Sequence, residues 1–415
     1  MDLSRYNWRT VLGVATAAML VQQSFSYVCH VVMPILADSI AEEFDISPAW
    51  LGLFLFIQNL MAIFTAVGCG SFILRLGPLR VSQLVLLSMV VSLMLISSGQ
   101  LWLYPMAAIL LGVSSASTPA SSHILAAVCP PRLAPLIFSI KQTGVPVGSL
   151  IGGLLVPFFL GLAYFNPTLG FDFQPGPFGA AFLTGMVVLS IIVLLQPFRA
   201  SFDAQRQPGL KITFANLRTT LADVLKHPDL RKLAFAAFAF GGMQSLFAGF
   251  FVLFLIDDLD FSVVEAGSIF AISSFTAVWA RILWGWLSGR FVEPGTIMAG
   301  IGLVGGLAAI FMANISATSS VTWITAIAIV YNMTVVSWHG LLLAETARLA
   351  PEGQVGGTTG GVLAFTSSAM LLYPAIYGAL LALTGSYTIG FMLAALPSFG
   401  AFFIFAIPSI GRKNA

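Results

Sequence analysis

The sequence contains few charged residues: only 8% of its 415 residues are Asp, Glu, Lys or Arg, against about 25% in soluble domains. Hydrophobic residues make up 58% of the chain, and the mean hydropathy is +0.96. A soluble core cannot bury that much apolar surface, whereas a lipid bilayer can accommodate it. The scarcity of charge therefore excludes an ordinary soluble protein and indicates a polytopic membrane protein. The net charge of +2 gives no sign of nucleic-acid binding, because the charges are too few and too scattered, and no nucleic-acid partner is expected.

Cysteine is scarce as well. The three cysteines, Cys29, Cys69 and Cys129, are odd in number and their spacing fits no metal site. We interpret them as small buried hydrophobic residues. The chain also lacks a recognisable nucleophile–base set, a metal-ligand cluster and a phosphate-binding loop. We therefore expect neither an enzyme nor a bound cofactor.

Long apolar runs are abundant. Twelve runs of roughly 20 residues, the length that crosses a bilayer as a helix, are separated by short polar loops. These predicted spans, numbered 1 to 12, lie near 11–36, 49–73, 81–98, 103–127, 136–162, 179–198, 233–256, 266–288, 297–313, 321–343, 357–382 and 388–408. The runs predict an all-α polytopic membrane protein with twelve transmembrane helices.

The distribution of Lys and Arg predicts the orientation of the spans. The loops after the odd-numbered spans contain no Lys or Arg, whereas 16 of the 18 basic residues lie at the two ends of the chain or in the other loops. Basic loops stay in the cytoplasm. Both termini are therefore expected to be cytoplasmic, which agrees with an even number of spans.

The longest polar stretch divides the predicted spans into two groups of six. It predicts an N-terminal bundle at 1–198, a cytoplasmic linker at 199–232 and a C-terminal bundle at 233–415. Leucines at helical spacing within the linker predict an amphipathic helix at the membrane surface. The organisation as two halves is typical of transporters built from repeats.

The two halves share a loop motif. The end of span 2 reads GSFILRLGPLR from residue 70 to 80, and the end of span 8 reads GWLSGRF from residue 285 to 291. Each motif has a Gly followed five residues later by an Arg, at the same place in its half. A repeat at matching positions supports the division into two related bundles.

With these motifs the chain resembles the major facilitator superfamily over nearly its whole length, which implies two six-helix bundles around a central cavity. The superfamily loop pattern is Gly-x-x-x-Asp-Arg-x-Gly-x-Arg. The matching residues are Gly70, Arg75, Gly77 and Arg80 in the first half, and Gly285 and Arg290 in the second. Leu74 and Gly289 stand where the Asp belongs, so the usual gating ion pairs lack their acid. Glu293 and Glu345 are the candidate replacement partners for Arg290.

Arg281 is the basic residue placed deepest in a predicted span. It lies eight residues before Gly289, about 12 Å along a helix, which is near mid-depth in a hydrocarbon layer about 30 Å thick. An arginine at that depth should face a partner or a watery cavity, and no predicted span interior contains Asp or Glu. We expect Arg281 to bind an anionic substrate through paired hydrogen bonds. Alternatively, it snorkels to the cytoplasm or caps carbonyl groups of a neighbouring helix.

A narrower resemblance supports the substrate role. An Arg four residues before Gly285 is similar to the pattern of oxalate- and monocarboxylate-type transporters in the superfamily, where that Arg contacts the substrate carboxylate. The oxalate type also uses a Lys in span 11, which is missing here between Gly357 and Ala382.

Lys141 is the second basic residue inside a predicted span. It lies about 7–10 Å into span 5, where it is a candidate second contact to the anion. The favoured alternative is that its stem lines the helix while its amine snorkels to the interface.

Polar residues form stripes in spans 1, 4, 7 and 10, the helices that line the cavity in the superfamily. In span 1, Gln23, Tyr27 and His30 share one face, and span 10 carries Asn332 and His339. We expect these five side chains to contact the substrate. The two histidines are the candidate proton carriers, although a neutral His bonded to a neighbour is the favoured interpretation.

The sequence thus predicts a secondary transporter that moves a small organic anion, a carboxylate, by alternating access. Proton symport or exchange against a counter-anion would both operate without a buried acid. A monomer in a bacterial inner membrane is expected. The alternatives are a drug or efflux transporter of the same fold, and a membrane receptor or assembly protein that does not transport.

Overall fold

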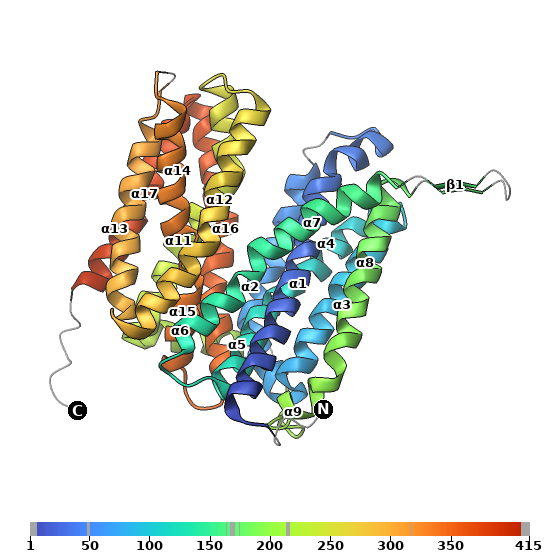
Figure 1. Cartoon of the computed structure of the whole chain (residues 1–415), viewed down its shortest axis with the longest axis vertical. Helices are drawn as coiled ribbons and strands as arrows, with labels where there is room; N and C mark the ends of the chain where they lie inside the picture. Colours follow the sequence, from blue (N-terminus) through green and yellow to red (C-terminus); the bar gives the residue numbers. More distant parts are fainter. Residues whose placement is uncertain are drawn as a thin grey trace. The chain divides into compact units, whose positions relative to one another are not determined.

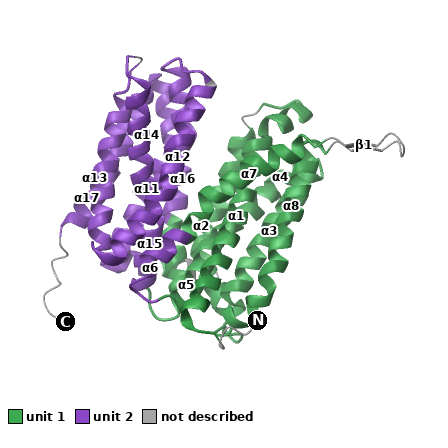
Figure 2. Cartoon of the chain, viewed as in Figure 1, with its two compact units in different colours: residues 1–129, 141–220, 350–364 green, residues 130–140, 221–349, 365–415 purple. Residues whose placement is uncertain are grey.

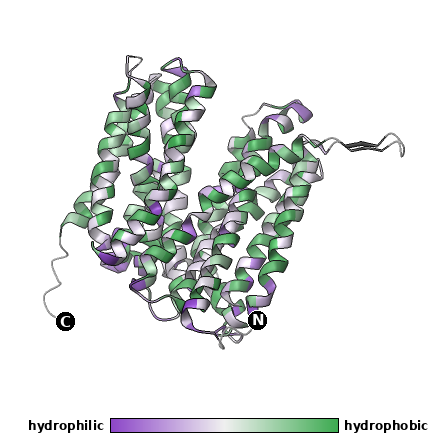
Figure 3. Ribbon diagram, in the orientation of Figure 1, coloured by the Kyte–Doolittle hydropathy of each residue, from purple (hydrophilic) through white to green (hydrophobic). Residues whose placement is uncertain are grey.

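The computed structural model describes most of the chain, namely residues 6–47, 50–162, 164–166, 171–173, 175–212, 216–316 and 318–407. In this part of the chain twelve helical segments are long and apolar enough to cross a membrane, and each coincides with one predicted span (Figure 1). Hydrophobic residues cover the length of the helices and hydrophilic ones gather near their ends (Figure 3). The prediction of an all-α protein with twelve transmembrane helices is confirmed.

The chain folds into two compact units (Figure 2). Unit 1 comprises residues 1–129, 141–220 and 350–364, and unit 2 comprises 130–140, 221–349 and 365–415. Most of each unit comes from one half of the sequence, but each also contains a short segment of the other half.

Unit 1 contains the first six spans apart from residues 136–140 of span 5, and it also contains the start of span 11 up to residue 364. Its elements are α1 (Trp8–Phe44), α2 (Trp50–Leu76), α3 (Pro78–Ser97), the 3₁₀ helix η2 (Leu101–Leu103), α4 (Tyr104–Gly112), η3 (Val113–Ala116), α5 (Ser117–Val128), α7 (Gly144–Leu160), β1 (Tyr164–Asn166), β2 (Phe171–Phe173), α8 (Gly176–Leu195), η4 (Gln196–Phe198) and α9 (Arg199–Phe202). The two strands, which the apolar pattern did not predict, pair antiparallel within one loop.

Glycines let α7 pack closely on α1 in unit 1. A side chain at Gly144 would lie 2.9 Å from the Cβ atom of Gln23, and one at Gly148 would lie 2.8 Å from the Cβ atom of Tyr27. Only a residue without a side chain leaves room for this approach. The glycines of span 5 therefore position the polar face of α1.

Unit 2 contains the last six spans apart from residues 357–364 of span 11, and it also contains residues 136–140 of span 5. Its elements are α11 (Pro228–Asp257), α12 (Val263–Arg290), α13 (Pro294–Ala313), α14 (Val321–Val335), α15 (His339–Leu349) and α17 (Tyr387–Ala406). The helix α6 (Ala134–Gln142) belongs to unit 2 up to Ile140, and α16 (Val355–Thr384) belongs to it from Phe365 onward. The linker helix α10 (Asn216–Lys226) spans the boundary of the two units and occupies part of the predicted amphipathic stretch.

Each unit contains one short segment from the other half of the sequence, 350–364 in unit 1 and 130–140 in unit 2. The first glycine of each loop motif packs closely against the segment in its own unit. In unit 1 a side chain at Gly70 would lie 2.8 Å from the Cα atom of Gly357, which belongs to the segment 350–364. In unit 2 a side chain at Gly285 would lie 2.5 Å from the Oγ atom of Ser139, in the segment 130–140. Both glycines of the sequence repeat are thus points of close helix packing.

Spans 4 and 10 are each interrupted. In span 4 the 3₁₀ helix η3 separates α4 from α5, and in span 10 residues 336–338 separate α14 from α15. These are the fourth spans of their respective halves. Interruptions at corresponding positions of two repeats are typical of substrate-binding regions in transporters, so they direct attention to the side chains around them.

Candidate functional site

In unit 1 the buried cation Lys141 is held by two neutral side chains. Its Nζ atom donates hydrogen bonds to Gln23 Oε1 at 2.7 Å and, at 3.4 Å, to Thr118 Oγ1. The lysine has no exposed surface, and it forms no ion pair among the residues that the structure describes. The expected alternative of an amine that snorkels to the interface is therefore wrong, because α1 and α5 supply oxygen atoms inside the unit.

Gln23 connects the elements around Lys141. Its Oε1 atom also accepts a hydrogen bond from Thr118 Oγ1 at 3.2 Å, so three helices meet at one oxygen. A buried ammonium without a counterion is costly unless its protons are hydrogen-bonded. The Gln23–Thr118 pair provides that compensation, and it makes this cluster the most polar point in the interior of unit 1.

His30 lies farther along α1 and is bonded on both ring nitrogens. Its Nδ1 atom is 2.9 Å from Gln58 Nε2, and its Nε2 atom is 2.9 Å from Ser114 Oγ. The ring of Tyr27 lies 5.6 Å from the His30 ring between centroids. Both nitrogens thus contact neutral neighbours, in agreement with the interpretation of His30 as a neutral histidine bonded to its surroundings.

In unit 2 the buried cation Arg281 contacts the interruption of span 10. It is 3% exposed, and its Nη2 atom donates to the carbonyl oxygen of Val336 at 3.1 Å. Carbonyl groups at the end of a helix need partners within the membrane. Of the two roles expected for Arg281, capping the carbonyl of a neighbouring helix is thus present in the structure.

Other donors complete the end of α14. The carbonyl of Met333 accepts from Trp284 Nε1 at 2.6 Å, and those of Asn332 and Thr334 accept from Ser337 Oγ at 2.8 Å and Ser337 N at 3.0 Å. With Arg281, these donors satisfy the carbonyl groups that the break leaves open. The interruption of span 10 is therefore stabilised by hydrogen-bond donors from unit 2 itself.

The two remaining candidates in span 10 lie on either side of the break. Asn332 is 1% exposed and donates to the carbonyl of Ala328 in its own helix at 3.0 Å. His339 is the first residue of α15, and its ring stacks on Trp338 with the centroids 3.8 Å apart. The structure brings both candidates to the same interrupted region as Arg281, in unit 2, and brings Gln23, Tyr27, His30 and Lys141 together in unit 1.

The start of α3 contacts an acid that the motif comparison missed, Asp203, which directly follows α9. Leu79 and Arg80 donate their backbone N–H groups to the carboxylate of Asp203, at 2.8 and 3.2 Å. Asp203 also lies 3.8 Å from Arg199 Nε, and Gly77, at φ 98°, packs against it. Burial raises the pKa of Asp203, while these hydrogen bonds and nearby arginines oppose the rise. Asp203 thus caps the start of α3.

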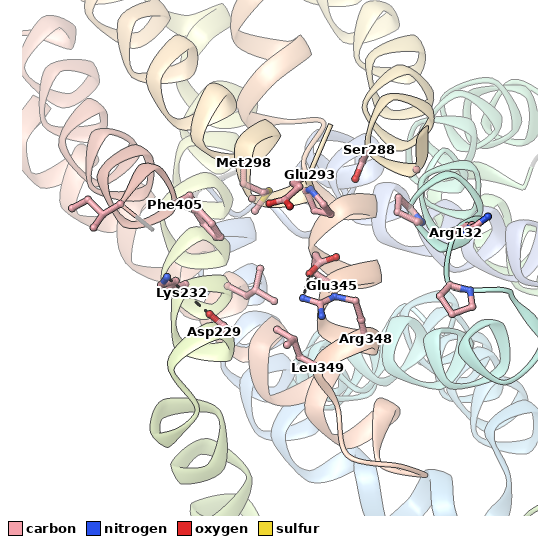
Figure 4. A pocket seen from close by; sticks show the side chains of 17 residues that line it. Arg132, Asp229, Lys232, Ser288, Glu293, Met298, Glu345, Arg348, Leu349 and Phe405 are labelled. Atoms are coloured by element: carbon pink, nitrogen blue, oxygen red, sulfur yellow. Dashed lines mark hydrogen bonds and ion pairs between the residues drawn. The ribbon is translucent and has the colours of Figure 1, made fainter. Parts of the chain in front are cut away.

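A charged pocket of about 430 Å³ lies in unit 2 near the second loop motif. Figure 4 shows Glu345 and Arg348 close together in it, with Asp229 and Lys232 to one side. Arg348 Nη2 pairs with Glu345 at 2.7 Å. Glu345 is therefore engaged with Arg348, and in the part of the chain that the structure describes Arg290 forms no ion pair; it lies over the ring of Phe291.

Sequence reasoning also missed Gln58 in the polar network of unit 1. It lies in the apolar run FLFIQNLMAIF of span 2, and a glutamine in such a run is the signal that could have found it. Asp203 offered no comparable signal, since its partners Leu79 and Arg80 lie more than 120 residues away.

Comparison with known proteins completes the description. The family model "Major Facilitator Superfamily" matches residues 14–360. No curated protein matches the sequence.

Several solved structures resemble the chain over nearly its full length. The human organic anion transporter MFSD10 (TETRAN) is 14% identical, with 97% of this chain and 100% of that chain covered and a TM-score of 0.74. The E. coli fucose:proton symporter FucP is 13% identical, with 95% of this chain and 98% of that chain covered and a TM-score of 0.70. A bacterial homologue of the iron transporter ferroportin is 13% identical, with 94% of this chain and 98% of that chain covered and a TM-score of 0.73. At these identities the likeness concerns the fold alone.

Proposed function

Because the chain belongs to the major facilitator superfamily, whose members are membrane transporters of small molecules, we propose that it is a secondary transporter of a small organic anion, a carboxylate. One observation carries this proposal. Each unit buries one basic side chain, Lys141 in unit 1 and Arg281 in unit 2, while no predicted span interior contains Asp or Glu. An anion is the kind of substrate that buried basic side chains attract in spans without Asp or Glu.

Each cation suits an anion in its own way. The planar guanidinium of Arg281 can donate two parallel hydrogen bonds to one carboxylate, whereas the ammonium of Lys141 acts as a compact point charge. The further candidate contacts to the substrate are Gln23, Tyr27 and His30 in unit 1, and Asn332 and His339 in unit 2. The resemblance of Arg281 to the arginine of oxalate- and monocarboxylate-type transporters supports the same substrate class.

The absence of acids from the predicted span interiors also favours particular coupling mechanisms. A monoanion that enters together with a proton, or that exchanges for a second anion, is transported without a titrating carboxylate. Members of the superfamily often use protons. We propose that the protein uses one of these two mechanisms, by alternating access. We also propose that it is a monomer in a bacterial inner membrane, with both termini in the cytoplasm.

The fold does not choose between substrate classes, since the similar structures include transporters of organic anions, fucose and protons, and a homologue of an iron transporter. A drug or efflux transporter for cations is less consistent with the buried charges, because Lys141 and Arg281 would repel a cation. A receptor without transport activity differs in one observable: it binds ligand without flux.

The test is carboxylate uptake by the purified protein in lipid vesicles. A panel of mono- and dicarboxylates is assayed with the unaltered protein, Arg281→Lys and Arg281→Gln, and with Arg132→Gln as a control that removes an exposed arginine of unit 2. We expect Arg281→Gln to lose at least about 100-fold in uptake, the effect of about 2.7 kcal/mol for a charged hydrogen-bond pair, and Arg281→Lys to retain part of it. Undiminished uptake in both variants would refute the role of Arg281. Saturable binding without uptake in the unaltered protein would indicate a receptor.

A further inference from the structure

A groove of about 500 Å³ opens on the surface of unit 1 where α8 continues through η4 into α9. Its lining includes Gln196, Arg199, Ala200, Asp203 and Arg206. We call it the η4–α9 groove. Its residues belong to η4, α9 and the segment after α9, whereas His30 belongs to α1 and Lys141 to α6. None of the groove residues has a role in the proposed transport.

The only acid that lines the groove is directed into the unit. Asp203 is 4% exposed, and both of its oxygen atoms accept hydrogen bonds from the start of α3. Arg199, by contrast, has 31% of its side chain exposed, and Arg206 is exposed. The surface that the groove offers to a ligand therefore carries the charge of two arginines.

Asp203 also explains why the two arginines gather here. Its carboxylate lies 3.8 Å from Arg199 Nε, and its field acts on Arg206 as well. The hydrogen bonds to α3 hold the acid in place, so it attracts both arginines of the groove lining without covering them. Two guanidinium groups in one groove are a suitable arrangement for binding phosphate oxygens.

The groove lies at the C-terminal end of the sixth candidate membrane span, Gly176–Phe202. It begins at Gln196, directly after the last turn of α8, where Val193 and Leu194 are 68% and 58% exposed. In a transmembrane helix such exposed apolar side chains face lipid. Basic pockets beside the ends of transmembrane helices bind the headgroups of anionic lipids.

We propose that the η4–α9 groove binds a phosphate group through Arg199 and Arg206, supplied by the headgroup of an anionic membrane lipid or by a soluble phosphate ester. The apolar end of α8 favours the lipid, because acyl chains can lie along Val193 and Leu194. The site is independent of the proposed carboxylate transport, so either proposal can fail without the other.

The test measures thermal unfolding of the purified full-length protein in detergent. The probes are short-chain phosphatidylglycerol, short-chain phosphatidylcholine and glycerol phosphate, each titrated separately. The variants are Arg199→Gln, Arg206→Gln and the double variant, and Arg132→Gln is the matched control in unit 2. A ligand that binds the folded state raises the unfolding temperature, and the stabilisation grows with the logarithm of its concentration divided by its dissociation constant, so a titration yields the affinity.

We expect phosphatidylglycerol to stabilise the unaltered protein and Arg132→Gln equally. Each single groove variant should bind about fivefold more weakly and the double variant about thirtyfold, from about 1 kcal/mol for each basic residue near an anionic headgroup. Stabilisation by phosphatidylglycerol alone identifies the lipid as the source, whereas equal stabilisation by glycerol phosphate identifies a soluble ester. Equal affinity in the double variant and the unaltered protein, or an equal loss in Arg132→Gln, would overturn the proposal. If Arg199→Gln fails to fold, Arg206→Gln alone decides, because Arg206 forms no ion pair among the described residues.

Discussion

Lys141 in unit 1 and Arg281 in unit 2 are buried to a similar degree, yet they are stabilised in different ways. Lys141 donates to two side-chain oxygens, those of Gln23 and Thr118. Arg281 donates to a backbone carbonyl, that of Val336, where span 10 is interrupted. One cation is surrounded by side chains, whereas the other is part of the backbone architecture of its unit.

The difference matters for how each cation can exchange partners. Side-chain oxygens such as those around Lys141 can rotate away, so the ammonium can pass from them to an incoming anion. The carbonyl at Val336 remains in place and requires a donor whether or not substrate is bound. Removing Lys141 should therefore affect function more than stability, while removing Arg281 should affect both.

The largest effect on stability is expected from removing the closest partner of Lys141. Gln23→Leu leaves the ammonium with only the longer hydrogen bond to Thr118, so we expect unfolding to become easier by about 2–3 kcal/mol, the value of a hydrogen bond to a charged group. Chemical denaturation of the purified protein measures it.

A double-mutant cycle provides the control for that prediction. When Lys141→Met is combined with Gln23→Leu, the buried charge is gone and the cost of Gln23→Leu should fall below about 1 kcal/mol. An unchanged cost in the double variant would show that Gln23 acts through packing against Gly144 and not through Lys141.

The corresponding change in unit 2 should have a somewhat smaller effect. Arg281→Met removes a donor from the carbonyl of Val336, and a buried acceptor without a partner costs about 1–3 kcal/mol. The same denaturation measurement applies. Arg281→Lys is the control, because an ammonium can donate to the same carbonyl, and a loss as large as that of Arg281→Met would contradict the capping role.

A third prediction concerns Asp203, which caps the start of α3 and contacts neither Lys141 nor Arg281 in the hydrogen bonds described above. The two carboxylate oxygens of Asp203 accept from the N–H groups of Leu79 and Arg80. Asp203→Asn replaces one of these oxygens by an NH₂ group, which can only donate. We expect a loss of about 0.5–2 kcal/mol, the range for helix capping residues, without a change in the KM of carboxylate uptake. Asp229, whose side chain is 38% exposed and pairs with Lys232 at 4.0 Å, is the matched control: Asp229→Asn should change stability much less.

The smallest effect on stability is expected from Lys141→Met itself. Replacing a buried charge by an apolar residue of similar length is close to neutral or stabilising, and Thr118 can keep its hydrogen bond to Gln23. Stability should change by less than about 1 kcal/mol, while carboxylate uptake falls. A loss of stability as large as that of Arg281→Met would contradict the difference between the two cations, because Lys141 would then contribute to stability as much as Arg281 does.

Much of the fold could be predicted from the sequence, because crossing a bilayer imposes a strong local signal. A run of about 20 apolar residues forms a helix regardless of its neighbours, and all twelve runs do so. The loop motifs at Gly70 and Gly285 were visible for a similar reason, as short repeats. Their physical role, close approach of Gly357 and Ser139, was not visible, since it depends on segments far away in the chain.

The candidate site could be predicted only in part. The pattern located Arg281 and Lys141, since charges stand out in apolar runs, and it located the face of α1 with Gln23 and His30. It could not decide whether the amine of Lys141 snorkels or stays buried, because that depends on Gln23 and Thr118 from two other helices. Nor could it find Gln58 as the partner of His30.

The sequence by itself determined the membrane-spanning helices and the membership in a transporter superfamily, because hydrophobic length and short motifs are local properties of the chain. The tertiary structure decided what each buried polar group contacts. Within the membrane every such group must find its partner inside the protein, and those partners come from helices that the sequence does not place next to one another. Lys141 with Gln23 and Arg281 with Val336 are results of that requirement, and the contact of Asp203 with the start of α3 depends in the same way on segments far apart in the chain.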